Sequence, residues 1–259
     1  MSDPTTSVPL SRRVPWAVPA GLLAGATLVH LGTQLRAPES VIADVTQVLL
    51  MPLLVWCFLT AVKARRRVQK QSVQRHSVPL HSGESEPHAR LVRLVLVALF
   101  FSWLGDTVPR FLAGDTAFLT LVGMFLIAQI VYIVAFWPSR RYSVAARRLG
   151  PVWLLPYLGL FALLLVLCAP HAGNLLVPVI LYGVALMTMA VLATGLGVLA
   201  GIGGAVFFVS DGLIAVRSLA GISLPAHDFL IMSTYIAAQV MIVLAIVRRT
   251  GPSASRPGR

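Results

Sequence analysis

Charged residues are scarce in this chain. Of its 259 residues only 12% are Asp, Glu, Lys or Arg, whereas soluble domains carry about 25%. So few charges cannot cover the surface of a globule, which excludes a soluble globular fold. Segments of about ten residues with alternating apolar and polar positions are also absent, which excludes a membrane β-barrel.

Cysteines and paired histidines are scarce as well. Cys57 and Cys168 both lie in apolar runs, and the six histidines include no pair with the spacing of metal ligands. We therefore expect no disulfide, no metal site and no organic cofactor. The net charge of +12 lies mostly in segments between apolar runs, which indicates cytoplasmic loops of a membrane protein rather than a nucleic-acid surface.

Long apolar runs, in contrast, fill most of the chain. Hydrophobic residues make up 57% of it, and they come in blocks long enough to cross a ~30 Å hydrocarbon core. The predicted fold class is therefore all-α, a polytopic membrane helix bundle of eight transmembrane helices. The glycine-rich turn at 193–197 is the weakest division, and it leaves a count of seven open. The predicted spans are 15–33, 44–62, 92–112, 117–137, 151–168, 174–193, 198–219 and 229–247.

Lysine and arginine predict the orientation, because they stay on the cytoplasmic side of multi-pass proteins. Of the 21 such residues, 18 precede span one, follow span eight, or lie between spans two and three or four and five. Only Arg36, Arg110 and Arg217 fall on the other side. This asymmetry predicts a multi-pass protein of the cell membrane with both termini cytoplasmic, which requires an even number of spans.

The segments outside the spans complete the predicted domain organisation. Residues 1–14 form an N-terminal cytoplasmic tail and 250–259 a disordered C-terminal tail, around a transmembrane domain at 15–249. The stretch 64–91 is mostly polar, with two prolines and no apolar period in its central part. We predict a mobile cytoplasmic linker there.

Two of the nine acidic residues lie deep inside predicted spans with apolar residues on both sides, whereas Asp44 stands at the first outer loop. Asp106 closes the block FFSWLGD, and Asp211 lies within AVFFVSDGLIA. A carboxylate costs roughly 2.5–3.5 kcal/mol or more at the centre of a membrane helix, so such residues mark functional sites by default. Both lie ~18–20 Å above the inner boundary of spans that run outward, so a bundle can bring them together.

Six further polar side chains reach the same layer, each within one helical turn of an acid or of another member of the set. Taken singly, such groups often only bond between membrane helices. Together with the two acids they predict a polar substrate pocket. They are Ser102, Gln129, Tyr132, Ser210, Tyr235 and Gln239. We expect aromatic walls around this pocket, from Phe101, Trp103, Phe125, Phe207 and Phe208.

Four short motifs contain these residues: FFSWLGD at 100–106, GMFLIAQIVYIVAF at 123–136, VFFVSD at 206–211 and YIAAQ at 235–239. In order, spacing and span assignment, they resemble the YhhN/TMEM86 family of eight-span membrane proteins over roughly residues 44–247. Characterised members of that family are lysoplasmalogenases. The resemblance implies an alkenylglycerophosphocholine or -ethanolamine hydrolase with Asp106 and Asp211 as its catalytic residues.

The chain departs from the family pattern at two positions. Gln47 stands near the start of span two, where a lysine is common in the family, and Gln129 stands where a histidine is expected. If these positions contact the head group or tune the acids, substrate choice differs here. Both glutamines are therefore counted among the candidate substrate-binding residues.

Hydrolysis of a vinyl ether needs a proton delivered to carbon, which gives an oxocarbenium-like cation to which water adds. By analogy with glycosidase carboxyl pairs, this requires one protonated carboxyl and one carboxylate. Asp106 and Asp211 supply such a pair, and either can be the acid. The expected partners are lysophospholipid or ether-lipid substrates that enter from the bilayer, together with other membrane lipids.

Two other functions would use the same residues. A proton-coupled transporter of a small molecule or lipid would relay protons through the two aspartates. Transporters are often built from two repeated halves, but this chain shows only a weak internal similarity, between FFSWLGD and FFVSD. A lipid-binding or assembly protein without chemistry would only pair the acids with neighbouring polar groups. Release of an aldehyde separates the hydrolase from both.

Overall fold

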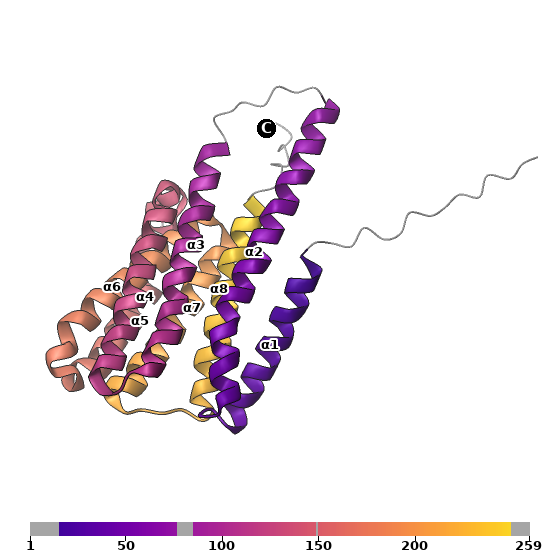
Figure 1. Cartoon of the computed structure of the whole chain (residues 1–259). Coiled ribbons are helices and arrows are strands. Elements are labelled where there is room, and N and C mark those ends of the chain that lie inside the picture. Colours follow the sequence, from indigo (N-terminus) through magenta and orange to yellow (C-terminus); the bar gives the residue numbers. More distant parts are fainter. Residues whose placement is uncertain (1–15, 77–84, 149, 250–259) are drawn as a thin grey trace, which may run out of the picture.

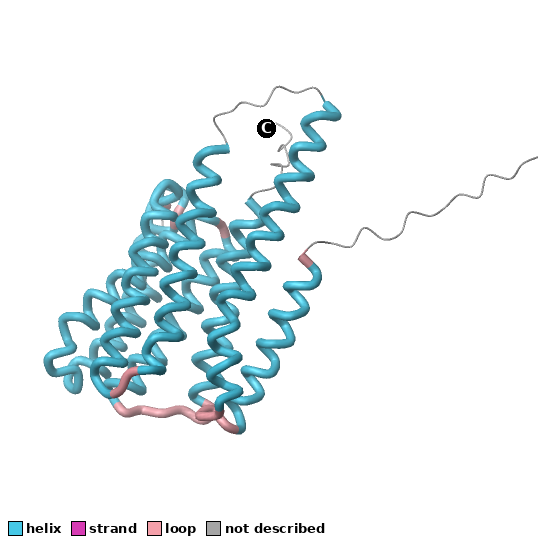
Figure 2. Tube along the Cα trace, in the orientation of Figure 1, coloured by secondary structure: helices cyan, strands magenta, loops and turns pink. Residues whose placement is uncertain are grey.

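The computed structural model describes residues 16–76, 85–148 and 150–249. These residues form eight α-helices joined by turns and short 3-10 helices, with no strand among them (Figures 1 and 2). The all-α prediction is thus confirmed. The helices are α1 Ala17–Arg36, α2 Val41–His76, α3 Ser85–Thr107, α4 Gly114–Phe136, α5 Gly150–Ala172, α6 Leu176–Ala193, α7 Val198–Ala220 and α8 His227–Arg249.

Seven stretches within the described residues are long and apolar enough to cross a membrane. Six of them each contain one α-helix, whereas the seventh, Val152–Leu196, contains both α5 and α6. Its 45 residues would extend about 68 Å as one helix, more than twice the ~30 Å hydrocarbon core. The chain instead turns at the 3-10 helix Gly173–Leu175, and α5 and α6 pack against each other.

The glycine-rich division between α6 and α7 is a real helix boundary. α6 ends at Ala193, a 3-10 turn covers Thr194–Leu196, and Gly197 has a φ of 114°. Only glycine adopts this backbone conformation without a steric penalty, so a new helix direction begins at this residue. Each of the eight predicted spans therefore overlaps its own α-helix.

The predicted linker at 64–91 is largely helical where the structure describes it. α2 continues to His76 and α3 begins at Ser85. The segment 63–75 contains no glycine or proline and is rich in Lys, Arg and Gln, which favour helix even without an apolar period. Residues 77–84 lie outside the described residues, as do the predicted tails at 1–14 and 250–259.

α7 and α8 form the most buried part of the bundle, and glycines on α7 allow close packing on two sides. A Cβ atom added to Gly203 would lie 3.1 Å from the Ala238 carbonyl oxygen of α8. A Cβ atom added to Gly204 would lie 2.9 Å from the Cα atom of Ala190 in α6. Lipid provides no hydrophobic driving force between helices, so such close backbone contacts supply much of the association energy.

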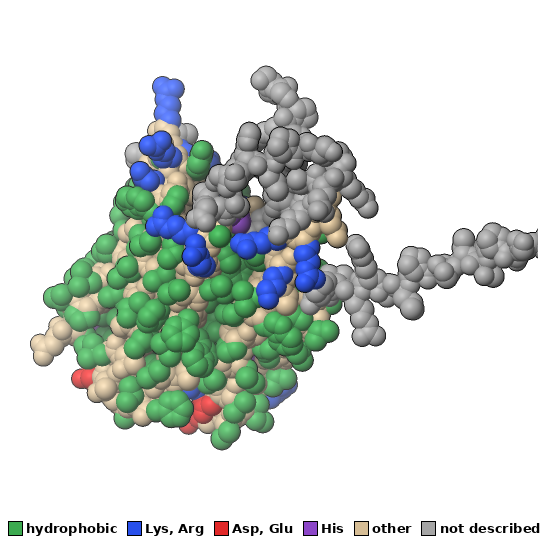
Figure 3. Space-filling model, turned by 45° about the horizontal axis from the view of Figure 1, so that its top comes forward, with side chains coloured by type: hydrophobic (Ala, Val, Ile, Leu, Met, Phe, Trp, Pro, Cys, Tyr) green, Lys and Arg blue, Asp and Glu red, His purple; other side chains and the backbone are tan. Residues whose placement is uncertain are grey.

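The two ends of the bundle differ in charge. Lysine and arginine side chains gather toward the end where α2 and α3 project, and hydrophobic side chains cover the visible sides (Figure 3). At the opposite end, two arginines are each paired with an aspartate, Arg110 with Asp44 and Arg217 with Asp228. We call this second end the outer end, after the orientation that the charges predict.

Candidate functional site

Asp106 lies near the end of α3 and is held from α8. The Tyr235 hydroxyl donates a hydrogen bond of 2.8 Å to Oδ2 of Asp106. Two T-shaped ring contacts fix the position of this tyrosine, with centroid distances of 5.8 Å to Phe125 and 5.6 Å to Phe207. The bond therefore joins α3 to α8 at a defined point, and the Gln47 side chain of α2 also lies beside the Asp106 carboxyl.

Asp211 lies in the middle of α7 and is held from α6 in the same manner. Its Oδ2 accepts a hydrogen bond from the Tyr182 hydroxyl. The carboxyl is buried, with 5% of the residue exposed. No hydrogen bond joins the two carboxyl groups within the described residues; each binds its own tyrosine instead.

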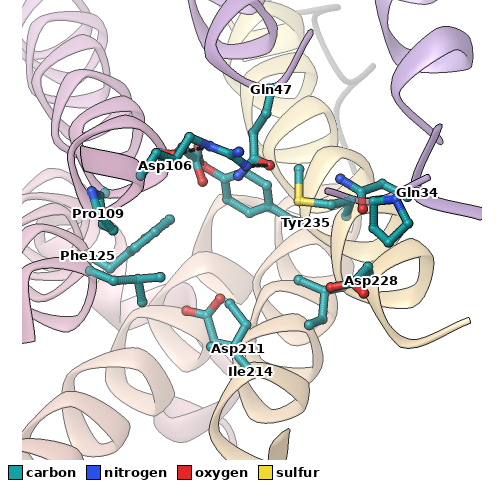
Figure 4. Close-up of a pocket in the computed structure, with 15 residues that line it drawn as sticks. Gln34, Gln47, Asp106, Pro109, Phe125, Asp211, Ile214, Asp228 and Tyr235 are labelled. Atoms are coloured by element: carbon teal, nitrogen blue, oxygen red, sulfur yellow. Dashed lines mark hydrogen bonds between the residues drawn. The ribbon is translucent and has the colours of Figure 1, made fainter. Parts of the chain in front are cut away.

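Both carboxyl groups line one cavity of about 360 Å³. Asp106 reaches it from α3 and Asp211 from α7, with Phe125 and Tyr235 between them in the wall (Figure 4). The cavity also borders Pro109 and Asp228, which lie at the outer end of the bundle. Two carboxyl groups that flank an open space are the arrangement that acid–base attack on a bound substrate requires.

Close packing beside the two acids positions them. A Cβ atom added to Gly105 would lie 2.6 Å from the Phe125 ring, and one added to Gly212 would lie 3.1 Å from Leu164.

Of the aromatic residues predicted to wall the pocket, only Phe125 lines the cavity. Trp103 donates to the Val48 carbonyl oxygen at 3.0 Å, and it faces α2 instead.

The seven predicted substrate-binding residues fall into two groups. Gln47 and Tyr235 line the cavity. Three others form a buried chain of hydrogen bonds away from it, in which the Tyr132 hydroxyl donates to Gln239 at 2.8 Å and Gln239 donates to Ser102 at 3.3 Å. This chain joins α4, α8 and α3.

The remaining two predicted residues, Ser210 and Gln129, also lie behind the cavity wall. The Ser210 hydroxyl donates to the Ile231 carbonyl oxygen at 3.0 Å. The carboxamide of Gln129 is fully buried, has no hydrogen-bond partner within 3.5 Å in the described residues, and lies beside the Tyr182 hydroxyl. Gln129 is thus placed next to the tyrosine that holds Asp211.

Tyr182 and Arg110 are the two site residues that sequence analysis missed. Tyr182 is the only tyrosine of α6, which is otherwise strongly apolar, and its polar hydroxyl at a mid-helix position was an available signal. Arg110 was assigned only to the outer side of the membrane. Its guanidinium lies at the cavity and contacts Asp44, Gln47 and the Asp106 carbonyl oxygen, the last at 3.2 Å.

A second, smaller cavity of about 30 Å³ adjoins the first. The two share Asp211, Phe125, Leu121 and Ile214, and the second is otherwise lined by apolar side chains of α4, α6 and α7 and by Tyr182. Within the described residues, no group of three or more His, Cys, Asp or Glu side chains is placed to hold a metal ion. The site therefore combines two carboxyl groups, a larger compartment of mixed polar and apolar lining, and a small apolar compartment.

Comparison with known proteins identifies the family. The profile of the YhhN family matches residues 42–246, most of the chain, and this region contains both aspartates. The chain belongs to the YhhN family. Within this YhhN chain, α1 lies outside the matched region, yet its Gln34 lines the cavity and contacts His30, which bonds to Thr46 of α2 at 2.9 Å.

Two curated relatives support this assignment. The human protein named lysoplasmalogenase TMEM86B is 32% identical over 174 residues, which cover 64% of this chain and 69% of that protein. The rat protein of the same name is 33% identical over 158 residues, which cover 60% of this chain and 61% of that protein, less than two thirds of its length. No solved structure matches the chain. The family and the apolar helices make this YhhN chain a multi-pass membrane protein.

Proposed function

We propose that the protein hydrolyses the vinyl ether bond of lysoplasmalogen-type lysophospholipids, with Asp106 and Asp211 as its acid–base pair. The observation that carries the proposal is that these two residues, from α3 and α7, line one cavity. The relatives named lysoplasmalogenase support the same reaction class and favour a hydrolase over a transporter.

The reaction has three steps. A protonated carboxyl gives its proton to the vinyl carbon remote from oxygen, and the double-bond electrons form the new C–H bond. The carbon attached to oxygen becomes an oxocarbenium ion, which the second, ionised carboxyl stabilises. That carboxylate takes a proton from water as its oxygen adds, and the resulting hemiacetal collapses to a fatty aldehyde and a glycerophospho-base.

The two tyrosines suit this cycle because each occupies one oxygen of its aspartate. Tyr235 fixes Asp106, with Gln47 beside the same carboxyl, and Tyr182 fixes Asp211, while both carboxyl groups line the cavity in which the substrate would bind. Both carboxyl groups thus have fixed orientations before substrate arrives, and fixed orientation is a large part of general acid–base catalysis. Either aspartate can start the cycle as the acid.

The two adjoining cavities suit a lipid with one chain. The larger cavity, which contains Gln47 and Arg110, has room for a polar glycerophospho group. The smaller cavity, between Phe118, Val122 and Val179, meets it at Asp211 and is apolar, but its volume of about 30 Å³ takes only a group about the size of one water molecule, so the rest of the chain would lie along the apolar outer surface of the bundle. The vinyl ether would then lie at the junction, beside the carboxyl groups.

We further propose that the chain crosses the membrane eight times, once with each α-helix, and that both termini are cytoplasmic. The arginine-rich end then faces the cytoplasm, as in other multi-pass proteins. The cavity is bordered by residues of the outer end, such as Pro109 and Asp228. Substrate would enter from the bilayer and bind in the outer half of the membrane.

Aldehyde release by the purified protein in detergent tests the proposal. Alkenylglycerophosphoethanolamine is the substrate, and we expect Asp106→Asn and Asp211→Asn each to lower the rate by about 10²–10⁴-fold. Asp115→Asn is the matched control, because Asp115 is exposed at the start of α4 and does not line the cavity. Normal turnover by either active-site variant contradicts a catalytic role for that aspartate, and proton-linked uptake without aldehyde release would indicate a transporter.

A further inference from the structure

The outer part of the larger cavity contains side chains of both charges. The Arg110 guanidinium and the Asp228 carboxylate both line it. Each is paired outside the cavity, Arg110 with Asp44 and Asp228 with Arg217. Formal charges in these two pairs cancel, so the cavity entrance presents separate positive and negative groups without a net charge.

Arg110 is held in place but keeps donors free. An arginine side chain has five N–H donors. Three contacts fix the guanidinium: Nε–H donates to the Asp106 carbonyl oxygen, one Nη to Gln47 and the other to Asp44. Two N–H groups remain, one on each terminal nitrogen, and a planar pair of donors is the geometry that binds two oxygens of a phosphate.

Arg110 is held close to Asp106 on the outer side of the cavity. Arg110 lies in the 3-10 helix Val108–Phe111 that follows α3, and its Nε is 3.2 Å from the Asp106 carbonyl oxygen. In a lysoplasmalogen, three carbons and one oxygen separate the vinyl ether oxygen from phosphorus. A vinyl ether beside Asp106 therefore brings the phosphate close to Arg110.

We propose that Arg110 binds the phosphate, and Asp228 the ammonium group, of a zwitterionic lysophospholipid head group. This inference rests on the proposed function, because it places the vinyl ether at the two aspartates. It makes the site selective for phosphoethanolamine and phosphocholine lipids. Lipids without phosphate lack the Arg110 contact, and lipids with an anionic head group place a charge near Asp228 that no ammonium group offsets.

A substrate panel tests the selectivity without any variant. Wild-type protein is given alkenylglycerophosphoethanolamine, alkenylglycerophosphoglycerol and the phosphate-free alkenylglycerol, all with one chain length. We expect kcat/KM for the first to exceed the other two by about ten- to hundredfold, the range of a charged hydrogen bond. Equal values for all three would overturn the proposal.

Variants assign the selectivity to the two residues. Arg110→Gln is expected to raise KM for the phosphoethanolamine substrate by about ten- to hundredfold, with kcat nearly unchanged and alkenylglycerol unaffected. Asp228→Asn is expected to reduce the preference for phosphoethanolamine over phosphoglycerol. Arg36→Gln is the control, an exposed arginine at the same end that does not line the cavity. Equal losses by Arg110→Gln on all substrates would mean a structural role.

A binding measurement separates this inference from the proposed reaction. The unreactive 1-O-hexadecylglycerophosphoethanolamine and 1-O-hexadecylglycerol are titrated into wild type and Arg110→Gln. Weaker binding of only the phosphate-containing lipid by the variant supports the head-group site, even if wild type cleaves no vinyl ether. Identical binding by both proteins overturns it, even if wild type is an active hydrolase.

Discussion

Tyr235 donates a hydrogen bond of 2.8 Å to Asp106 and so joins α8 to α3 at the edge of the cavity. Tyr182 makes the corresponding bond to Asp211, from α6 to α7. Two aspartate–tyrosine pairs thus meet at one space, and four helices must be in place for both pairs to form. The site is therefore a property of the assembled bundle rather than of any local motif.

The first prediction concerns these tyrosines. Tyr235→Phe and Tyr182→Phe keep the rings but remove the bonds that orient the carboxyl groups. We expect each to lower kcat about ten- to hundredfold, within the range of acid–base contributions, with little change in KM. Tyr142→Phe serves as control, since Tyr142 is exposed near the arginine-rich end. Wild-type kcat in both active-site variants would contradict an orienting role.

The second prediction follows from protonation at carbon. When hydrolysis runs in D₂O and the aldehyde is reduced at once to the alcohol, the product should carry one deuterium on the carbon next to the former carbonyl carbon. The deuterium marks the bond formed by the general acid. Mass spectrometry of the alcohol measures it. Product without this deuterium would exclude protonation at that carbon.

The third prediction tests the smaller cavity. Ala215→Phe fills space lined by Phe118, Val179 and Asp211. We expect KM to rise about fourfold for substrates with sixteen-carbon chains and to change little for chains too short to reach this space, because its volume of about 30 Å³ holds about one CH₂ group, whose lost burial costs ~0.8 kcal/mol. Val177→Phe, at an exposed position on α6, is the control. An equal change in KM for all chain lengths would show that the hydrocarbon chain of the substrate binds elsewhere.

The fourth prediction concerns packing. Gly204→Ala puts a Cβ atom 2.9 Å from Ala190 Cα, so α6 and α7 must separate. We expect about 1–3 kcal/mol of destabilisation, seen as a lower midpoint of thermal unfolding in detergent. Gly21→Ala in α1 has nothing within 4 Å of the added atom, and it should leave the midpoint unchanged or raise it. Equal midpoints for the two variants would show that the bundle accommodates the methyl group.

The fifth prediction concerns the buried chain Tyr132–Gln239–Ser102, which the sequence assigned to substrate binding. Because these residues do not line the cavity, we expect Ser102→Ala and Tyr132→Phe to lower stability by about 0.6 kcal/mol each. KM should change by less than about twofold. A large increase in KM with unchanged stability would show that these residues do contribute to substrate binding.

Much of the helix pattern was available from the sequence, because twenty-residue apolar blocks leave little choice of structure in a membrane. The two aspartates were also found, since a carboxyl group within a membrane span is costly and therefore marks a functional site. It was harder to predict which side chains of each helix line the cavity. Gln239 and Tyr235 share one face at i, i+4, yet only Tyr235 lines the cavity, because the tilt and packing of neighbours decide which turn faces an opening.

Tyr182 and Arg110 were the main omissions, whereas Tyr235, the partner of Asp106, was predicted. Tyr182 stands alone in an apolar helix, where a tyrosine often serves packing, and only the contact between α6 and α7 brings it to Asp211. Arg110 looked like an ordinary charge at a helix end. Its three contacts depend on the position of α2 beside α3, which no residue spacing within α3 predicts.

The two adjoining cavities border different parts of the bundle, so the proposed reaction would release its two products toward different surroundings. One is bordered by residues of the outer end, such as Pro109 and Asp228, and the other lies between helices at Phe118 and Val179, which are partly exposed. A freed aldehyde would diffuse sideways into the lipid leaflet, while the water-soluble fragment would leave on the far side from the cytoplasm. The cell would then have to import that fragment before reusing it.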